Sequence, residues 1–139
     1  LHLALASRSE SEPRATLHEL LSLRDRRPND LLLQRMIASG YRRVGQLEDA
    51  VKLLNALVEK YPDDPNLRFE RGLLAIDRDR PQEAETDLNW VRERQPDAPE
   101  VYMALSRCMT QLGRVEQSKA YLDRFLELDS ARLASRPGG

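Results

Sequence analysis

The side chains that could carry out catalysis or bind a metal are few and lie far apart in the sequence. Of the two histidines, His2 and His18, neither has a second histidine four residues away, so the helical two-histidine motif that binds zinc is absent. The single cysteine, Cys108, excludes an intrachain disulfide and a paired-thiol metal site. Because Cys108 falls inside a helical stretch, we interpret it as a small structural residue rather than a reactive thiol.

The carboxylates do not form a catalytic pair either. They are numerous but scattered along helices, at spacings of three or four residues from another charged residue, as at Glu83 and Asp87 or at Glu116 and Lys119. We expect these charges to lie on solvated helix faces. No glycine-rich phosphate-binding loop follows a strand, because no strand is expected. The sequence therefore predicts a protein that is not an enzyme, with no catalytic residue, no cofactor and no metal site.

Composition indicates one all-α domain. The chain has 139 residues, of which 40% are hydrophobic and 32% charged, and the good helix formers Leu, Ala, Arg and Glu dominate. Aromatic residues make up only 5%, and residues that favour strands are few. We therefore expect helices and little or no sheet.

Charge and hydropathy disfavour two classes of partner. The formal net charge is −1, whereas a dedicated nucleic-acid-binding protein is usually clearly basic. No apolar run approaches the ~18–20 residues needed to span a bilayer, and the opening segment is too short for a signal peptide. We therefore expect neither nucleic-acid binding nor direct membrane insertion. The chain begins without Met, which favours an excised domain or a processed form.

A regular internal repeat organises the chain. Three segments align without a gap. Three kinds of marker recur every 34 residues (84 − 50 and 118 − 84): a small residue, a residue at the end of the unit and a turn residue. Agreement of three markers over three copies argues against coincidence. The repeats are 31–64, 65–98 and 99–132. The markers are Ala50, Ala84 and Ser118; Pro62, Pro96 and Ser130; and Gly45, Asp79 and Gly113.

Each repeat predicts a pair of helices. In the first repeat, Asn29 or Asp30 can cap the opening helix by accepting hydrogen bonds from its first amides. Gly45 supplies the left-handed backbone of a short helix–helix turn, and a second helix follows over 47–60. In the second repeat Asp79 takes the place of the turn glycine, and aspartate tolerates this backbone less well than glycine does.

These residues resemble the tetratricopeptide repeat family, and the resemblance covers about 31–132. The fit is good at repeat positions 8, 20 and 24, where the family has two small residues and a large apolar one. The small residues lie where the two helices of a hairpin approach closely, so a larger side chain there should cost ~1–3 kcal/mol. The resemblance implies an all-α, right-handed solenoid of antiparallel helical hairpins, about three and a half units long. The matching residues are Ala38, Gly72 and Ser106; Ala50, Ala84 and Ser118; and Leu54, Leu88 and Leu122.

Three residues depart from the family pattern. Gln34, Arg68 and Arg71 are polar where the family is usually apolar. Arg71 is the least expected of them: either its stem covers the core while its charge stays in water, or the second repeat is locally shifted. Trp90 is expected to pack on the outer side of its hairpin, where an exposed ring would instead mark a contact with a partner.

The flanking segments continue the repeat less clearly. Residues 11–26 keep the apolar spacing of a second helix, so 1–6 is expected to be the remnant of a first helix and 7–11 the turn between them. Residues 1–30 are thus assigned to an eroded or truncated repeat. Residues 133–139, where the apolar periodicity stops, are assigned to a disordered tail.

The resemblance also implies where a ligand binds. In the family, the first helix of each hairpin lines the concave face, so the expected ligand is a peptide or helix of a partner protein. Phe69, Leu73 and Ile76 follow helical spacing and make an apolar stripe, with arginines at its sides. Such a surface suits apolar anchors accompanied by carboxylates. The expected groove residues are Arg35, Arg42, Phe69, Leu73, Ile76, Met103 and Arg107.

Other interpretations stay open. Phe69, Leu73 and Ile76 could be buried against the neighbouring hairpin instead of facing a ligand. The last predicted helix presents apolar side chains that a following hairpin would cover, so it could mediate self-association into a homo-oligomer. A regulatory segment of a larger enzyme or of an assembly-machinery protein is a third possibility. The expected self-association residues are Tyr121, Leu122, Phe125 and Leu128.

Overall fold

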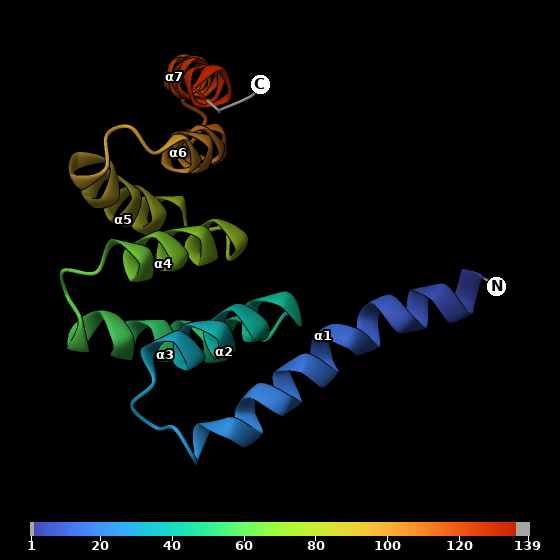
Figure 1. Cartoon of the computed structure of the whole chain (residues 1–139). Coiled ribbons are helices and arrows are strands. Elements are labelled where there is room, and N and C mark those ends of the chain that lie inside the picture. Colours follow the sequence, from blue (N-terminus) through green and yellow to red (C-terminus); the bar gives the residue numbers. More distant parts are fainter. Residues whose placement is uncertain (1, 136–139) are drawn as a thin grey trace. The chain divides into compact units, whose positions relative to one another are not determined.

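The structure of this chain, a computed structural model, describes residues 2–135, with side chains from Glu12 onward. These residues form helices joined by short turns, without a strand among them (Figure 1). The all-α prediction is therefore confirmed. The chain divides into two compact units, unit 1 (Leu1–Pro62) and unit 2 (Asp63–Gly139), and each is described by itself. The helices are α1 (His2–Arg24), α2 (Leu31–Arg43), α3 (Leu47–Lys60), α4 (Pro65–Asp77), α5 (Pro81–Arg94), α6 (Pro99–Gln111) and α7 (Val115–Ala134).

Unit 1 consists of α1, α2 and α3. Asp30 caps the start of α2, where its carboxylate accepts a hydrogen bond from the Leu33 amide at 3.1 Å. A Cβ atom placed on Gly40 of α2 would lie 3.0 Å from Leu17 Cδ1 of α1, so the missing side chain permits this close approach of the two helices. Leu17, Leu33 and Ile37 form a buried apolar cluster between α1 and α2.

The N-terminal segment differs from the prediction. α1 is one continuous helix, so the turn expected over 7–11 is absent, and with it the hairpin of an eroded repeat. Residues 7–11 include no glycine or proline, and the helix also continues through Pro13. The following helix pair has the predicted bounds, since α3 begins at Leu47 and ends at Lys60.

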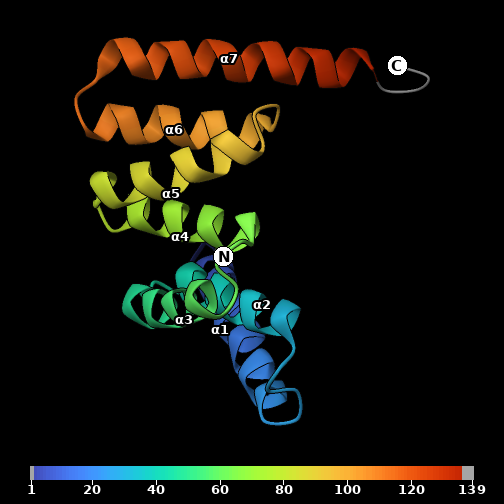
Figure 2. The ribbon, with the colours of Figure 1, turned by 90° about the vertical axis from the view of Figure 1, so that its left-hand side faces the viewer.

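Unit 2 stacks α4, α5, α6 and α7 in chain order (Figure 2). α4 pairs with α5, and α6 pairs with α7, while α6 also packs against α5 and α4. Short turns make each pair antiparallel. The core of unit 2 lies between α4, α5 and α6. One buried cluster of this core consists of Ala75, Ile76, Ala84, Leu88, Val91, Val101, Ala104, Leu105, Cys108 and Met109.

The helices of each hairpin in unit 2 meet at small residues. Ala84 is fully buried, and a Cβ atom placed on Gly72 would lie 2.9 Å from Leu88 Cδ2. Because Leu88 is itself fully buried, it has little room to move away. In the α6–α7 hairpin the equivalent residues are Ser106 and Ser118, whose hydroxyl oxygens lie 3.0 Å apart. Small side chains at these two repeat positions therefore set how closely the helices pack.

The turn within each hairpin uses left-handed backbone at the predicted residue. Gly45 has a φ of 83° and Gly113 a φ of 75°. Asp79 has a φ of 56° and is the one non-glycine residue with positive φ in the described part of the chain. The turn residues that mark the repeat therefore mark a backbone requirement, which Asp79 meets at a steric cost.

The C-terminal helix is longer than predicted. α7 continues through Ala134, so a disordered tail starting at 133 is wrong for the first two residues assigned to it. Leu133 and Ala134 are good helix formers, and no glycine or proline interrupts the sequence before Pro137. Residues 136–139 of the predicted tail lie outside the described residues.

Cys108 lies in the core of unit 2. Its side chain is fully buried, and the thiol donates a hydrogen bond to the carbonyl oxygen of Pro81 at 3.1 Å. Burial raises the pKa of the Cys108 thiol from 9.0 to about 11. The sulfur is therefore both protonated and shielded at neutral pH, as expected of a structural cysteine.

Replacing the strained turn residue should stabilise the protein. Asp79→Gly removes the steric cost of a Cβ atom at positive φ, so the free energy of unfolding should rise by about 0.5–1 kcal/mol. Urea denaturation followed by circular dichroism measures this change. Gly113→Asp, which places the same strain in the next hairpin, is the matched control and should lower stability. A loss of stability in Asp79→Gly would show that the carboxylate contributes more than the strain costs.

The thiol should be unreactive while the protein is folded. At pH 8 a pKa of about 11 leaves on the order of one thiol in a thousand ionised, and burial blocks access as well. A chromogenic disulfide reagent should therefore modify native Cys108 at least ~100-fold more slowly than the denatured chain. Because the folded pKa is the higher one, the contribution of the thiol to stability is complete below pH 9 and is lost as the pH rises towards 11. Equal rates for native and denatured protein would contradict this assignment.

Candidate protein-binding surface

The first helices of the two hairpins in unit 2, α4 and α6, lie against each other. The side-chain amide of Gln111 donates a hydrogen bond to the carbonyl oxygen of Ile76 at 2.9 Å, and Arg107 Nη2 lies 3.9 Å from Asp77 Oδ1. Both contacts join the C-terminal parts of α4 and α6. The repeat therefore brings residues of these two helices side by side to form one surface.

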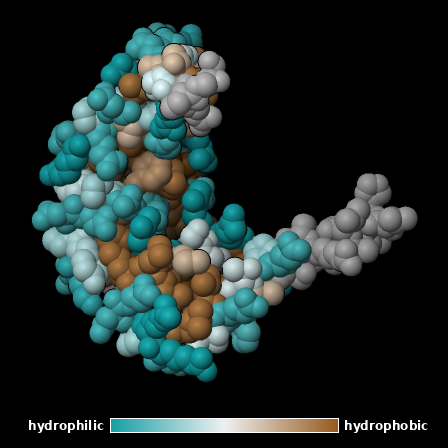
Figure 3. Space-filling view, in the orientation of Figure 1, coloured by the Kyte–Doolittle hydropathy of each residue, from teal (hydrophilic) through white to brown (hydrophobic). Residues whose placement is uncertain are grey.

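An apolar strip lies along this pair of helices. Phe69 and Leu73 are half-buried and lie one helical turn apart on α4, at the edge of the core of unit 2. Met103, at the repeat position of Phe69, is 37% exposed on α6. In Figure 3, hydrophobic surface is visible between hydrophilic residues over this unit. We call Phe69, Leu73, Met103 and Arg107 the α4–α6 face.

Ile76 does not belong to this face. It is only 3% exposed and lies within the hydrophobic core of unit 2, so it has almost no surface to offer a ligand. The three-residue step from Leu73 to Ile76 turns the side chain from the surface towards α5 and α6. Of the predicted apolar stripe, the structure therefore leaves Phe69 and Leu73 partly accessible and removes Ile76.

The charged groups around the face are held in different ways. The side chain of Arg107 is 52% exposed, and its distance to Asp77 exceeds that of a hydrogen bond. Glu100, by contrast, accepts a hydrogen bond from Arg132 Nη2 at 2.6 Å. This bond holds the pKa of the Glu100 carboxyl below its ordinary value. The face therefore presents a guanidinium beside the apolar strip, while the nearby Glu100 is neutralised by its own partner.

Two predicted groove residues, Arg35 and Arg42, belong to α2 in unit 1. Both are half-buried there, and their part in ligand binding stays a prediction. α2 also exposes Leu32, which the repeat register places among the groove positions, and Met36, which sequence reasoning did not select. Their spacing of four residues, one turn of a helix, is the signal that marks them.

The comparisons with known proteins agree with this geometry. The family model of the tetratricopeptide repeat matches residues 37–109, slightly more than half of the chain. This chain belongs to the tetratricopeptide repeat family. Repeats of this kind form extended surfaces that serve as protein-interaction scaffolds. No curated protein matches the chain.

Solved structures with the tetratricopeptide architecture of this chain include two of MamA. MamA MSR-1 C2 aligns with a TM-score of 0.72 at 23% identity, covering 95% of this chain and 76% of that one. MamA 41-end from Desulfovibrio magneticus RS-1 aligns with a TM-score of 0.76 at 15% identity, covering 93% of this chain and 72% of that one. At these identities the likeness shows the fold alone.

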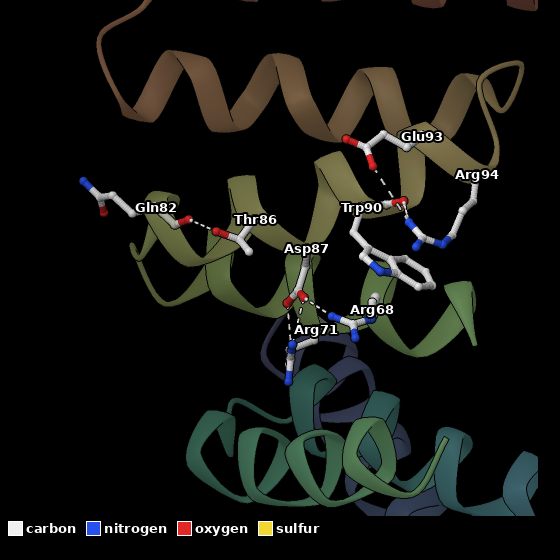
Figure 4. A network of polar contacts seen from close by, with 8 residues as sticks. All are labelled: Arg68, Arg71, Gln82, Thr86, Asp87, Trp90, Glu93 and Arg94. Carbon is white, nitrogen blue, oxygen red and sulfur yellow. Dashed lines mark hydrogen bonds and ion pairs between the residues drawn. The ribbon is translucent and has the colours of Figure 1, made fainter. Parts of the chain in front are cut away.

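The arginines that depart from the tetratricopeptide pattern share one buried carboxylate (Figure 4). Arg71 donates two hydrogen bonds to Asp87 of α5, from Nε to Oδ2 at 2.7 Å and from Nη2 to Oδ1 at 2.8 Å. Arg68 Nη1 lies 3.7 Å from Asp87 Oδ1, and the Asp87 side chain is only 6% exposed. The bidentate bond raises the pKa of Arg71 above its ordinary value, because it stabilises the charged form.

The second repeat is not locally shifted. α4 begins at Pro65, midway in the sequence between the start of α2 at Leu31 and the start of α6 at Pro99, so the second repeat keeps the helix register of its neighbours. Arg71 is instead accommodated because Asp87 supplies a partner across the α4–α5 hairpin. A polar pair therefore replaces an apolar contact at this repeat position.

Trp90 completes this cluster and is not an exposed binding residue. The guanidinium groups of Arg94 and Arg68 both lie close to its half-buried ring, at 3.5 Å and 4.4 Å from the ring centroid (Figure 4). Arg94 Nη1 also donates a hydrogen bond to the Trp90 carbonyl oxygen at 3.0 Å. The ring therefore serves cation–π packing within its own hairpin.

The predicted self-association residues do not share one exposed face of α7. Tyr121 packs against the core of unit 2, with its ring centroid 6.1 Å from that of Tyr102, and Phe125 and Leu128 are half-buried. Of these four residues, Leu122 alone is exposed. The spacing of Tyr121, Phe125 and Leu128 places them on the side of α7 that packs on α6, which explains the difference.

Two further searches concern the described residues only. Among their side chains, no group of three or more His, Cys, Asp or Glu residues is arranged to hold a metal ion. None of the described helices combines the length and the apolar character that a membrane span requires.

Breaking the Arg71–Asp87 pair should destabilise the protein. Asp87→Asn keeps the shape of the side chain but leaves Arg71 half-buried without its carboxylate, so the free energy of unfolding should fall by about 2 kcal/mol. The pair Arg71→Met with Asp87→Leu removes both charges and should cost less than Asp87→Asn alone. The free energy of unfolding of each variant is measured by chemical denaturation.

The matched control is an exposed pair in the same unit. Arg114 Nη1 lies 2.9 Å from Glu85 Oε2, but both side chains are more solvated than Asp87. Glu85→Gln should therefore change stability by less than about 1 kcal/mol. An effect of Asp87→Asn no larger than that of Glu85→Gln would show that the buried pair contributes no special stability.

Proposed function

We propose that this tetratricopeptide protein is a non-catalytic scaffold that binds a peptide or helix of another protein on the α4–α6 face. The observation that carries the proposal is the partly exposed apolar strip of Phe69, Leu73 and Met103 beside the exposed guanidinium of Arg107. An enzyme is disfavoured, because neither the sequence nor the described side chains present a catalytic pair or triad.

The apolar strip supplies area for anchoring residues. Met103 is exposed, and Phe69 and Leu73 are each half-buried at the core edge. Covering such side chains removes apolar surface from water, which contributes roughly 25 cal/mol per Å². Because Phe69 and Leu73 already pack against the core, they are held in place before a ligand arrives, and little conformational entropy is lost on binding.

The charge beside the strip favours a ligand with carboxylates. Arg107 is held by Asp77 only at 3.9 Å, so a ligand carboxylate at hydrogen-bonding distance would interact more strongly with the guanidinium. Glu100 is neutralised by Arg132 and therefore repels such a ligand less than a lone carboxylate would. An amphipathic helix or extended segment with apolar anchors and acidic residues fits these groups.

A variant of the face tests this function. Met103→Glu combined with Arg107→Glu replaces an exposed apolar side chain and reverses the charge, while neither residue lies in the core cluster. In a pull-down from the lysate of the source organism, a polypeptide retained by the native chain should be lost by this variant. Circular dichroism should show unchanged helicity.

The control variant changes a surface elsewhere in unit 2. Ala131→Glu places the same acidic side chain at an exposed position of α7, on the side of the helix away from its exposed leucines. The polypeptide lost by the face variant should remain bound to this control. Retention of the same polypeptides by all three proteins would reject the α4–α6 face as the binding surface.

A further inference from the structure

One side of α7 carries a line of exposed apolar residues. Val115, Leu122, Leu126 and Leu133 are all exposed, and they are spaced by seven, four and seven residues. At 3.6 residues per turn, these spacings place the four side chains on one side of the helix over its whole length. We call these four residues the α7 stripe. No residue of α7 is fully buried, and no described helix packs on its outer side (Figure 2).

The preceding hairpin shows what covers such a line. Leu88 of α5 occupies the same repeat position as Leu122 of α7, and Leu88 is 0% exposed whereas Leu122 is 39% exposed. α5 is covered by α6, which contributes Val101, Ala104, Leu105, Cys108 and Met109 to the shared core. The repeat therefore covers this side of a helix with another helix, whose apolar residues are spaced by three, one, three and one.

The border of the α7 stripe is acidic. Glu116 and Asp123 are exposed on one side of it, together with Lys119. Asp129 is half-buried near its other side, where the guanidinium groups of Arg114 and Arg132 already pair with Glu85 and Glu100. Glu116 and Asp123 form no ion pair with any described residue. Glu127, in contrast, pairs with Arg124 at 3.2 Å and lies away from the stripe. A helix that covers the stripe therefore meets a net negative border.

We infer that the α7 stripe binds a helix of a partner protein that has an apolar side spaced like that of α6 and Lys or Arg along its borders. Apolar burial supplies the contact, and the basic borders meet Glu116 and Asp123. This surface is separate from the α4–α6 face and does not depend on the function proposed for it. The two surfaces belong to different helices of unit 2.

A second copy of α7 carries the same net negative border and lacks the basic groups that would complement it. An antiparallel pair of α7 helices would match the two apolar stripes and bring Asp123 of one copy close to Asp123 of the other, while Asp129 would lie level with Lys119. Like charges facing each other across a helix pair are destabilising. A basic border on the occupant removes this penalty.

Two designed peptides test the inference without the natural partner. Each is a labelled helix of about 20 residues, long enough to hold helical structure, with apolar residues spaced as in α6. One carries Lys along both borders, and the other carries Glu at the same positions. Fluorescence anisotropy at low ionic strength is measured on the variant Met103→Glu with Arg107→Glu, so that the acidic peptide has no binding surface on the α4–α6 face. It should give a dissociation constant at least tenfold lower for the Lys peptide, and added salt should reduce the difference. Equal affinities, or no binding of either peptide, would overturn the inference.

Matched variants locate the site. Leu126→Gln and Leu133→Gln remove apolar contact without changing charge, and either should weaken binding of the Lys peptide at least tenfold. Glu116→Lys with Asp123→Lys should reverse the preference between the two peptides. Met103→Gln, on the α4–α6 face, is the control and should leave binding unchanged. Loss of binding in Met103→Gln but not in Leu126→Gln would assign the peptide to the α4–α6 face and reject this inference.

Sedimentation equilibrium of the native chain distinguishes a partner helix from a second copy of the chain as the occupant of the α7 stripe. A monomer whose stripe binds the Lys peptide supports the inference. A dimer that becomes monomeric in Leu126→Gln would show that a second copy covers the stripe, and the inference would be wrong. Because the α4–α6 face is intact in Leu126→Gln, a negative result here leaves the test of the proposed function unaffected.

Discussion

The close approach of paired helices determines most of this structure. Two helices can pack at short distance only where their facing side chains are small, and Gly72 lies so near Leu88 that a single added carbon would clash. Ala84 and the hydroxyl pair of Ser106 and Ser118 meet the same requirement in other ways. Once this spacing is set, the large apolar residues one turn away can enter the core, and the outward-facing side chains are placed on a regular surface.

Residues that obey this constraint could be predicted from the sequence, because it recurs at a constant interval along the chain. The bounds of α3 and the turn residues Gly45, Asp79 and Gly113 agree with the structure for that reason. Outside the repeat the sequence contains no second copy to compare, and there the predictions were wrong. The extension of α7 to Ala134 depends on local helix propensity, which the repeat pattern does not report, whereas α1 is one helix despite its internal Pro13.

Side-chain roles were harder to predict than helices. The partner of Arg71 lies on the opposite helix of its hairpin, so only the structure shows that Asp87 accepts its two hydrogen bonds. The structure leaves Phe69 and Leu73 of the predicted groove partly accessible, but the three-residue step to Ile76 places that side chain in the core. Sequence spacing predicts which side of a helix a residue lies on, but an error of one residue turns the side chain by about 100°. Such a turn can move a side chain from the surface into the core.

The position of α7 as an outer layer has a consequence for the motions of unit 2. α6 is packed on both sides, by α5 and by α7, whereas α7 is held on one side only and buries no residue fully. Local opening of α7 therefore exposes less apolar surface than opening of α6, and its amide hydrogens should exchange with solvent sooner. A helix bound to α7 would restrict that opening. Binding at this end of the unit should therefore slow the exchange of amide hydrogens and raise the melting temperature of the entire unit.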